Sequence, residues 1–168
     1  MLSQRPINLQ EDQQLVLDLV CQASYESVPD WLRSENYRAY HDFWVNSSLA
    51  GDVIRDLRGS LEDDRTIAEV WLEDNKPAGI LWVSFTDSPY KVVIARVRDL
   101  VVAPQHQRRG IGTLMMKAAE ELARERGARV LRAETGVENN ASQVMYGNHG
   151  FRVVSLVYEK ALEDPPFP

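Results

Sequence analysis

The sequence predicts an α/β (α+β) fold, in which a mixed, mostly antiparallel sheet carries one βαβ unit that binds a cofactor. Two β-rich segments joined by the turn Asp74–Pro77 are typical of a hairpin. A strand, a glycine-bearing loop, an amphipathic helix and another strand then follow between residues 91 and 135. Such a crossover needs parallel strands, so the sheet must be mixed. Helical patterns precede both units.

The elements follow in the order β-α-α-β-β-β-α-β-α-β. Asn8 followed by Glu11 resembles a capping box, which predicts a helix from Glu11 to Glu26 after a short strand at 5–9. The other expected elements are one or two helices within 30–61, strands at 65–73, 78–85 and 91–102, a helix after the glycine loop, a strand at 128–135, a helix at 139–149 and a last strand at 151–162. We expect residues 1–168 to form a single domain whose acidic, proline-rich tail, 163–168, is flexible.

Composition excludes several classes of protein. A net charge of −6 argues against nucleic acid as the main partner. No run of 18 apolar residues exists, so we expect no membrane span. Cys21 is the single cysteine, and the three histidines have no metal-ligand spacing, so we expect neither a disulfide nor a metal. A cytoplasmic location is the default expectation.

The stretch from Val101 to Arg126 is the centre of the prediction. Pro104 ends a strand, a polar and basic loop follows, and Gly110 and Gly112 open a helix with one apolar face. The free N–H groups at a helix start carry partial positive charge and bind anions. Arg108 and Arg109 add two full charges beside them. The loop is therefore suited to phosphate, most plausibly a diphosphate.

Two blocks carry a resemblance to a known family. Gln107–Gly112 (QRRGIG) resembles the Q/R-x-x-G-x-G/A signature of the GNAT superfamily of acetyl-CoA-dependent N-acetyltransferases. Asn139–Tyr146 (NNASQVMY), followed by Gly150-Phe151, resembles the family's N-x-x-A/S-x-x-L-Y…G-F segment. The resemblance covers about 91–162. A dinucleotide site is disfavoured because G-x-G-x-x-G is absent.

The resemblance implies the GNAT fold, acetyl-CoA as cofactor and a set of residues that hold it. The pyrophosphate would lie on the N–H groups of 108–112. The pantetheine amides would pair with the main chain of 100–102, while Asn139 and Ser142 touch the pantetheine arm. The implied cofactor-binding residues are Leu100, Val101, Val102, Gln107, Arg108, Arg109, Gly110, Ile111, Gly112, Asn139, Ser142 and Tyr146.

Acetyl transfer to an amine needs a neutral amine, donors for the oxyanion and a proton for the departing thiolate. We expect Tyr146 to be the general acid, near the thioester sulfur. Glu134 is the first candidate for the base, since some relatives that acetylate protein N-termini use a Glu at the matching place. Asp99 is second and Glu69 third. The first two have structural alternatives: Glu134 could pair with Arg98 or Arg132, and Asp99 with Arg96 or Arg98.

The acceptor is less defined than the donor. One hypothesis is an aromatic acceptor pocket for a cationic or aromatic amine, and the alternative is that the same side chains only pack two helices together. These side chains are Trp31, Tyr37, Tyr40, Phe43 and Trp44. A CoA-binding regulatory module without catalysis, or an enzyme with another acyl donor, such as succinyl- or propionyl-CoA, remains an alternative function. Assembly as a homodimer is left open.

Overall fold

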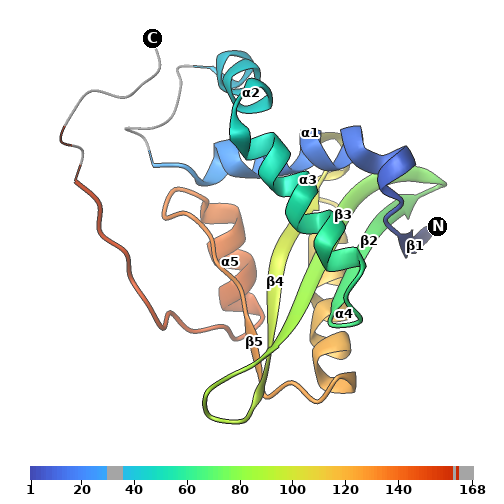
Figure 1. The fold of residues 1–168 in the computed structure, drawn as a ribbon, viewed down its shortest axis with the longest axis vertical. Helices are drawn as coiled ribbons and strands as arrows, with labels where there is room; N and C mark the ends of the chain where they lie inside the picture. The colour runs from blue at the N-terminus through green and yellow to red at the C-terminus, as the bar shows by residue number, and fades with distance from the viewer. Residues whose placement is uncertain (30–35, 161, 163–168) are drawn as a thin grey trace.

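The computed structural model describes residues 1–29, 36–160 and 162, and Figure 1 shows one twisted sheet with helices on both faces. The sheet order among these residues is β1-β2-β3-β4-β5. All neighbouring pairs are antiparallel except β4 and β5, which are parallel. The strands are β1 (Leu2–Pro6), β2 (Thr66–Glu73), β3 (Lys76–Asp87), β4 (Val93–Val102) and β5 (Val130–Arg132).

The helices divide between the two faces of the sheet. Helices α1 (Leu9–Ser27), α2 (Tyr37–Asn46) and α3 (Ser48–Leu61) pack on one face, around Leu57, Ile80 and Trp82. Helix α4 (Ile111–Glu125) packs on the other, around Met115 and Leu81, with α5 (Asn140–Asn148) beside it. The mixed sheet confirms the expected fold class.

Helix α1 begins two residues earlier than its pattern predicted, because an aspartate completes its cap. Asn8 is the N-cap, and its side chain accepts a hydrogen bond from the N–H of Gln10. The carboxylate of Asp12, rather than that of Glu11, accepts the N–H of Asn8 at 2.8 Å. The guanidinium of Arg5 donates two hydrogen bonds of 2.7 Å to the same carboxylate. This pairing lowers the pKa of Asp12 despite its burial.

A bulge in β4 decides which side chains face which helices. Val83 lies opposite Val97, but Trp82 lies opposite Asp99, so Arg98 is an extra residue in β4. Val97 packs on the α4 face, whereas Val101 packs on the face covered by α1–α3. Side chains alternate along a strand, so without the bulge these odd-numbered positions would share one face. The extra residue therefore turns Asp99 toward the N-terminal helices.

Strands β4 and β5 separate after Arg96, and we call the opening beside Val97–Val102 of β4 the fork. Strand β5 pairs with β4 over Ile94, Ala95 and Arg96 only. From Val97 to Val102, β4 keeps β3 as its neighbour and has no second strand among the described residues. The chain leaves β5 and passes to the C-terminal end of α1, where a Cβ on Gly136 would lie 1.9 Å from the main-chain oxygen of Ser27. One side of β4 is consequently open.

Two expectations about the ends of elements were wrong. The last strand, expected at 151–162, is not formed by the described residues in that range, because the chain leaves Phe151 in an extended, exposed path away from the sheet (Figure 1). The strand expected at 128–135 is shorter, at Val130–Arg132. Residue 161 and the tail 163–168 lie outside the described residues, as does Trp31.

Gly79 is required where β3 and β4 approach each other. We predict that Gly79→Ala lowers the free energy of unfolding by about 1–3 kcal/mol, because its Cβ would lie 2.3 Å from the main-chain oxygen of Val101. The matched control is Gly59→Ala in α3, where a Cβ meets nothing within 4 Å. That change should raise stability by about 0.5–1 kcal/mol. Urea denaturation of both variants measures the difference, and equal effects would contradict the prediction.

Candidate active site

The loop after β4 leaves the start of helix α4 uncapped. A short 3-10 helix, η2 (Pro104–His106), turns the chain, and Arg108 and Gly110 both adopt positive φ, at 60° and 82°. Gly110 is the N-cap of α4, and no side chain accepts a hydrogen bond from the helix start. Ile111 is buried, so only its main chain can reach a ligand. The N–H groups of this helix start therefore have no side-chain partner, as an anion site at this place would require.

Glu73 holds part of this loop. Its carboxylate is 2.7 Å from the guanidinium of Arg109 and shares a 2.7 Å hydrogen bond with the ring of His106. The sequence interpretation counted Arg109 as a full charge beside the helix start, but its guanidinium is paired with Glu73 of β2, as is the ring of His106. Arg108 is exposed and forms no ion pair with another described residue. Arg108 is the loop arginine whose charge is available to a ligand.

The open side of β4 presents main-chain groups to the fork. The N–H of Ala103 donates to the oxygen of Ala78 at 2.8 Å, and Val101 points its oxygen at Gly79. Groups alternate along a strand, so those of Leu100 and Val102 face away from β3. The side chain of Gln107 donates to the oxygen of Val102 at 3.1 Å, which ties the loop to the strand end.

Helix α5 forms the other side of the fork. Asn139 is its N-cap, accepting the N–H of Ser142 at 3.0 Å, while its amide nitrogen lies 3.5 Å from the hydroxyl of Ser27. Asn139 therefore has a clear structural task, which the sequence reading did not foresee. A Cβ on Gly112 would lie 3.6 Å from both Met145 and Val102, so α4, α5 and β4 converge at this glycine.

Tyr146 and Asp99 are close enough to influence each other across the fork. Burial raises the pKa of Tyr146, and the charge of Asp99 raises it further. The tyrosine ring also packs on Phe151, with ring centroids 5.3 Å apart. The phenol is therefore protonated at neutral pH and able to donate a proton.

The carboxylates expected as candidate bases are in different environments. Asp99 is partly buried and pairs with no described cation, and burial raises its pKa to about 7 against the opposing pull of Arg98. Glu134 has a side chain that is 74% exposed and forms an ion pair with Arg96 at 3.2 Å. Glu69 shares the face of β2 that carries Trp71, on the α4 side of the sheet and away from Asp99. Asp99 alone lies beside both Tyr146 and a pocket.

That pocket, of about 280 Å³, lies between the N-terminal helices and strands β3 and β4. Trp44 and Trp82 form apolar walls, and Asp99 lies on its lining. Asp52 and Asp56, one helical turn apart on α3, add two more carboxylates. Sequence reasoning missed Trp82, Asp52 and Asp56, although the spacing of four places both aspartates on one helix face.

Arg98 limits the negative charge of this pocket. Its guanidinium lies 5.1 Å from the centre of the Trp82 ring and 3.9 Å from the carboxylate of Asp56. The alternative in which Arg98 pairs with Asp99 is not what the structure shows, because Arg98 forms its ion pair with Asp56. The Asp99 carboxylate remains available to a bound molecule.

The expected aromatic wall is only partly present. Among the described aromatics of that segment, Trp44 lines the pocket, whereas Tyr40 is buried and hydrogen-bonded to Ser24. Tyr37 packs edge-on against Tyr25, and Phe43 is 42% exposed. Most of this segment thus packs the helices together, as the alternative interpretation held.

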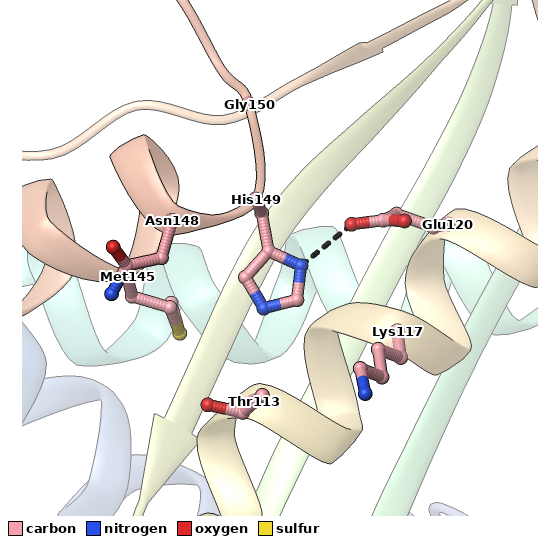
Figure 2. A pocket seen from close by; sticks show the side chains of 7 residues that line it. All are labelled: Thr113, Lys117, Glu120, Met145, Asn148, His149 and Gly150. Atoms are coloured by element: carbon pink, nitrogen blue, oxygen red, sulfur yellow. Dashed lines mark hydrogen bonds and ion pairs between the residues drawn. The ribbon is translucent and has the colours of Figure 1, made fainter.

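A second groove, of about 460 Å³, runs between α4 and the end of α5 (Figure 2). Thr113, Lys117 and Glu120 line it from α4, and Glu120 shares a 2.7 Å hydrogen bond with His149 across it. The groove begins in the first turn of α4, next to the free N–H groups. Its lysine provides a positive charge close to the anion site.

Two further observations concern only the described parts of the chain. No helix there is long and apolar enough to cross a bilayer. No three His, Cys, Asp or Glu side chains among these residues are grouped so that they could hold a metal ion.

The titration of Asp99 can be tested without any substrate. We predict that carbon-13 NMR of aspartate carboxyl groups shows one signal that titrates near pH 7, because burial disfavours the ionised form. Asp99→Asn should remove that signal and leave the others in place. Titration of the Asp99 signal below pH 5 would contradict the prediction.

Comparisons with known proteins agree with the geometry. The model of the "Acetyltransferase (GNAT) family" matches residues 25–151. An uncharacterized N-acetyltransferase of Methanocaldococcus jannaschii is 32% identical over 101 residues, which cover 57% of this chain and 42% of that protein. The streptothricin acetyltransferase of Streptomyces lavendulae is 35% identical over 98 residues, covering 58% and 50%. The matches thus span about half the length of these curated relatives.

Solved structures show the same fold. A crystal structure of a predicted acetyltransferase from Clostridium acetobutylicum, determined with acetyl-CoA, superposes with a TM-score of 0.69 at 15% identity, and the match covers 96% of this chain and 97% of that chain. At this identity the likeness concerns the fold alone. Together with the family match over most of the chain, it confirms the resemblance carried by the two sequence blocks: the chain belongs to the GNAT acetyltransferase family.

Proposed function

We propose that this chain is an acetyl-CoA-dependent N-acetyltransferase in which an amine attacks the thioester directly in a ternary complex. The fork beside β4 is the observation that carries the proposal. It joins an uncapped helix start, an open strand edge, Tyr146 and Asp99 at one place. Membership of the GNAT family supports the same activity.

The donor would lie along the fork. Its diphosphate would accept hydrogen bonds from the main-chain N–H groups of 108–112, with the charge of Arg108 beside them. The pantetheine arm would add to β4 through Leu100 and Val102, as an extra strand adds to a sheet edge. The groove between α4 and α5 leaves room for the adenosine end, where Lys117 suits its 3′-phosphate.

The acceptor would enter through the pocket on the other face of β4. Trp44 and Trp82 would contact its apolar part, and the carboxylates of Asp52 and Asp56 would attract a cationic amine. The bulge at Arg98 turns Asp99 into this pocket. An amine bound there would approach the thioester from the side opposite to the groove.

The residues in place can perform each proton transfer. Asp99, whose pKa is about 7, accepts a proton from the ammonium, which frees the nitrogen lone pair. The nitrogen attacks the carbonyl carbon, and the C–S bond breaks as the tetrahedral adduct collapses. Tyr146 gives its proton to the departing thiolate, since its raised pKa keeps it protonated until then. The nitrogen of the new amide passes its second proton to the Tyr146 phenolate, which restores the phenol. The products are then the neutral amide and the free thiol of CoA.

The choice of base gives a first prediction. Asp99→Asn should lower kcat for thiol release from acetyl-CoA by about 10²- to 10⁴-fold, because Asp99 lines the pocket and its charge also reaches Tyr146. Wild-type activity should fall as pH drops through about 7, since the base acts in its ionised form. The matched control is Glu134→Gln, which removes an exposed carboxylate and should change kcat less than tenfold. A larger loss in Glu134→Gln would make Glu134 the base.

The donor site gives a second prediction. Arg108→Ala should weaken CoA binding more than Arg109→Ala, because Glu73 already holds Arg109. Calorimetry with CoA measures both, and we expect the ratio of the two Kd values to be about 2- to 5-fold, of the order of one exposed ion pair. Equal losses would show that Arg109 leaves Glu73 for the diphosphate.

The same assays separate catalysis from regulation. If the wild type releases thiol with some member of a panel of small amines and peptide N-termini, and Tyr146→Phe slows it, the enzyme proposal stands. Binding of CoA without turnover for any amine would favour a regulatory CoA-binding module instead. An absence of CoA binding would overturn both.

A further inference from the structure

The segment after α5 is apolar, extended and exposed. Residues 152–160 form no strand and bury no side chain in the described chain, and Figure 1 shows them running away from the sheet. Its large apolar side chains are between 69% and 87% exposed: Val153, Val154, Leu156, Val157 and Tyr158. Isolated exposed apolar residues are ordinary, but a contiguous run of this kind marks an interaction site.

The pattern of this segment is that of a strand covered on both faces. In an extended chain, Val153 and Val157 point to one side, while Val154, Leu156 and Tyr158 point to the other. A strand with one solvated face would alternate apolar and polar residues. Ten residues, 151–160, in this conformation span roughly 33 Å, which is ample for pairing with another strand.

The outer edge of β5 in the same molecule is unpaired among the described residues, and apolar side chains near it are exposed. β5 is the last strand in the sheet order among the described residues, and its outer edge pairs with none of them. Val130 on β5 is 43% exposed, Val137 in the following loop 77% and Val144 on α5 63%. Helix α5 has no fully buried residue. An open edge and an apolar surface therefore occur together.

The start of the segment is held in place. The N–H of Phe151 donates to the oxygen of Tyr146 at 3.0 Å, and its ring packs on the Tyr146 ring. Gly150, at a φ of 77°, makes the turn between the helix and the segment. The segment thus leaves a fixed point on α5 and projects outward, away from the β5 edge of its own chain (Figure 1).

We propose that residues 151–160 pair with the β5 edge of a second copy of this chain, which returns its own segment in the same way. One chain holds both the unpaired strand and the edge that lacks a strand, so each copy supplies what the other needs. Such a reciprocal contact closes after two copies, as an isologous dimer does. It provides hydrogen-bond partners for the main-chain groups at the open edge of β5 and covers both apolar faces of the segment.

The exchange also bears on the candidate site. Asn139 caps α5, and Ser142 and Tyr146 lie on it. The apolar residues Val144 and Met145 of this helix are incompletely covered in one copy. A strand from the partner would pack beside this helix and hold it. The inference rests on exposure and strand pairing, so it stands or falls independently of acetyl transfer.

Light scattering after size exclusion tests the proposal directly. The wild type should have the mass of two 19.1 kDa chains. The double variant Val154→Pro/Leu156→Pro removes two N–H donors from the segment and should be a single chain. The matched control, Val154→Thr/Leu156→Thr, keeps the N–H groups and strand propensity and should stay a dimer. A monomeric wild type, or a dimeric proline variant, would overturn the proposal.

A cross-link distinguishes exchange from pairing within one chain and does not rely on the proline variant. The double variant Val130→Cys/Val154→Cys places one thiol on β5 and one on the segment, while the native Cys21 is buried. A bismaleimide that spans about 10 Å, roughly two strand spacings, tolerates differences in register. Covalent dimers in a denaturing gel are the expected result. Only intrachain links, or no links at all, would count against exchange.

Discussion

The open side of β4 is the constraint on which the rest of the molecule depends. A parallel neighbour pairs with this strand over three residues and then leaves it, so the main-chain groups of Leu100 and Val102 face away from β3 toward no other described strand. The side chain of Gln107 satisfies the oxygen of Val102, but the other main-chain groups on this side would be costly to bury unless a ligand or water satisfied them. In this chain the fork is therefore both a defect of the sheet and the place where a second molecule can bind as a strand would.

The single-residue bulge at Arg98 links the two faces of the sheet at this fork. It reverses the direction of every following side chain in β4, so Asp99 faces the pocket while the main chain beside it borders the fork. A carboxylate so placed is drawn out of water, and its pKa rises to about 7. Arg98 would have neutralised this group, but it lies over Trp82 and pairs with Asp56 instead. Asp99 is thus kept near its point of ionisation.

One unsatisfied edge belongs to β4 after the point where β5 leaves it, and the other is the outer edge of β5. β5 leaves β4 open on its inner side and has no described neighbour on its outer side. The inner opening suits an extended arm of a cofactor, and the outer one suits an extended segment of chain. Helix α5 borders the fork through Met145, so its placement affects what can bind there. A helix with no fully buried residue depends on such neighbours.

The sequence by itself determined the order of elements, the mixed sheet, the glycine loop before α4 and the family, because these follow from local patterns: periodicity, turn residues and short spaced motifs. It did not determine the partners of side chains distant in the chain. The ion pairs of Arg109 with Glu73 and of Glu134 with Arg96, and the cap that Asp12 completes on Asn8, needed the register of the strands. A one-residue bulge, invisible to an alternating pattern, decided that Asp99 rather than Glu134 is buried beside the pocket. The final segment has the composition of a strand, but only tertiary structure could show that it lacks a neighbour in its own chain, because strand pairing depends on contacts that no local pattern records.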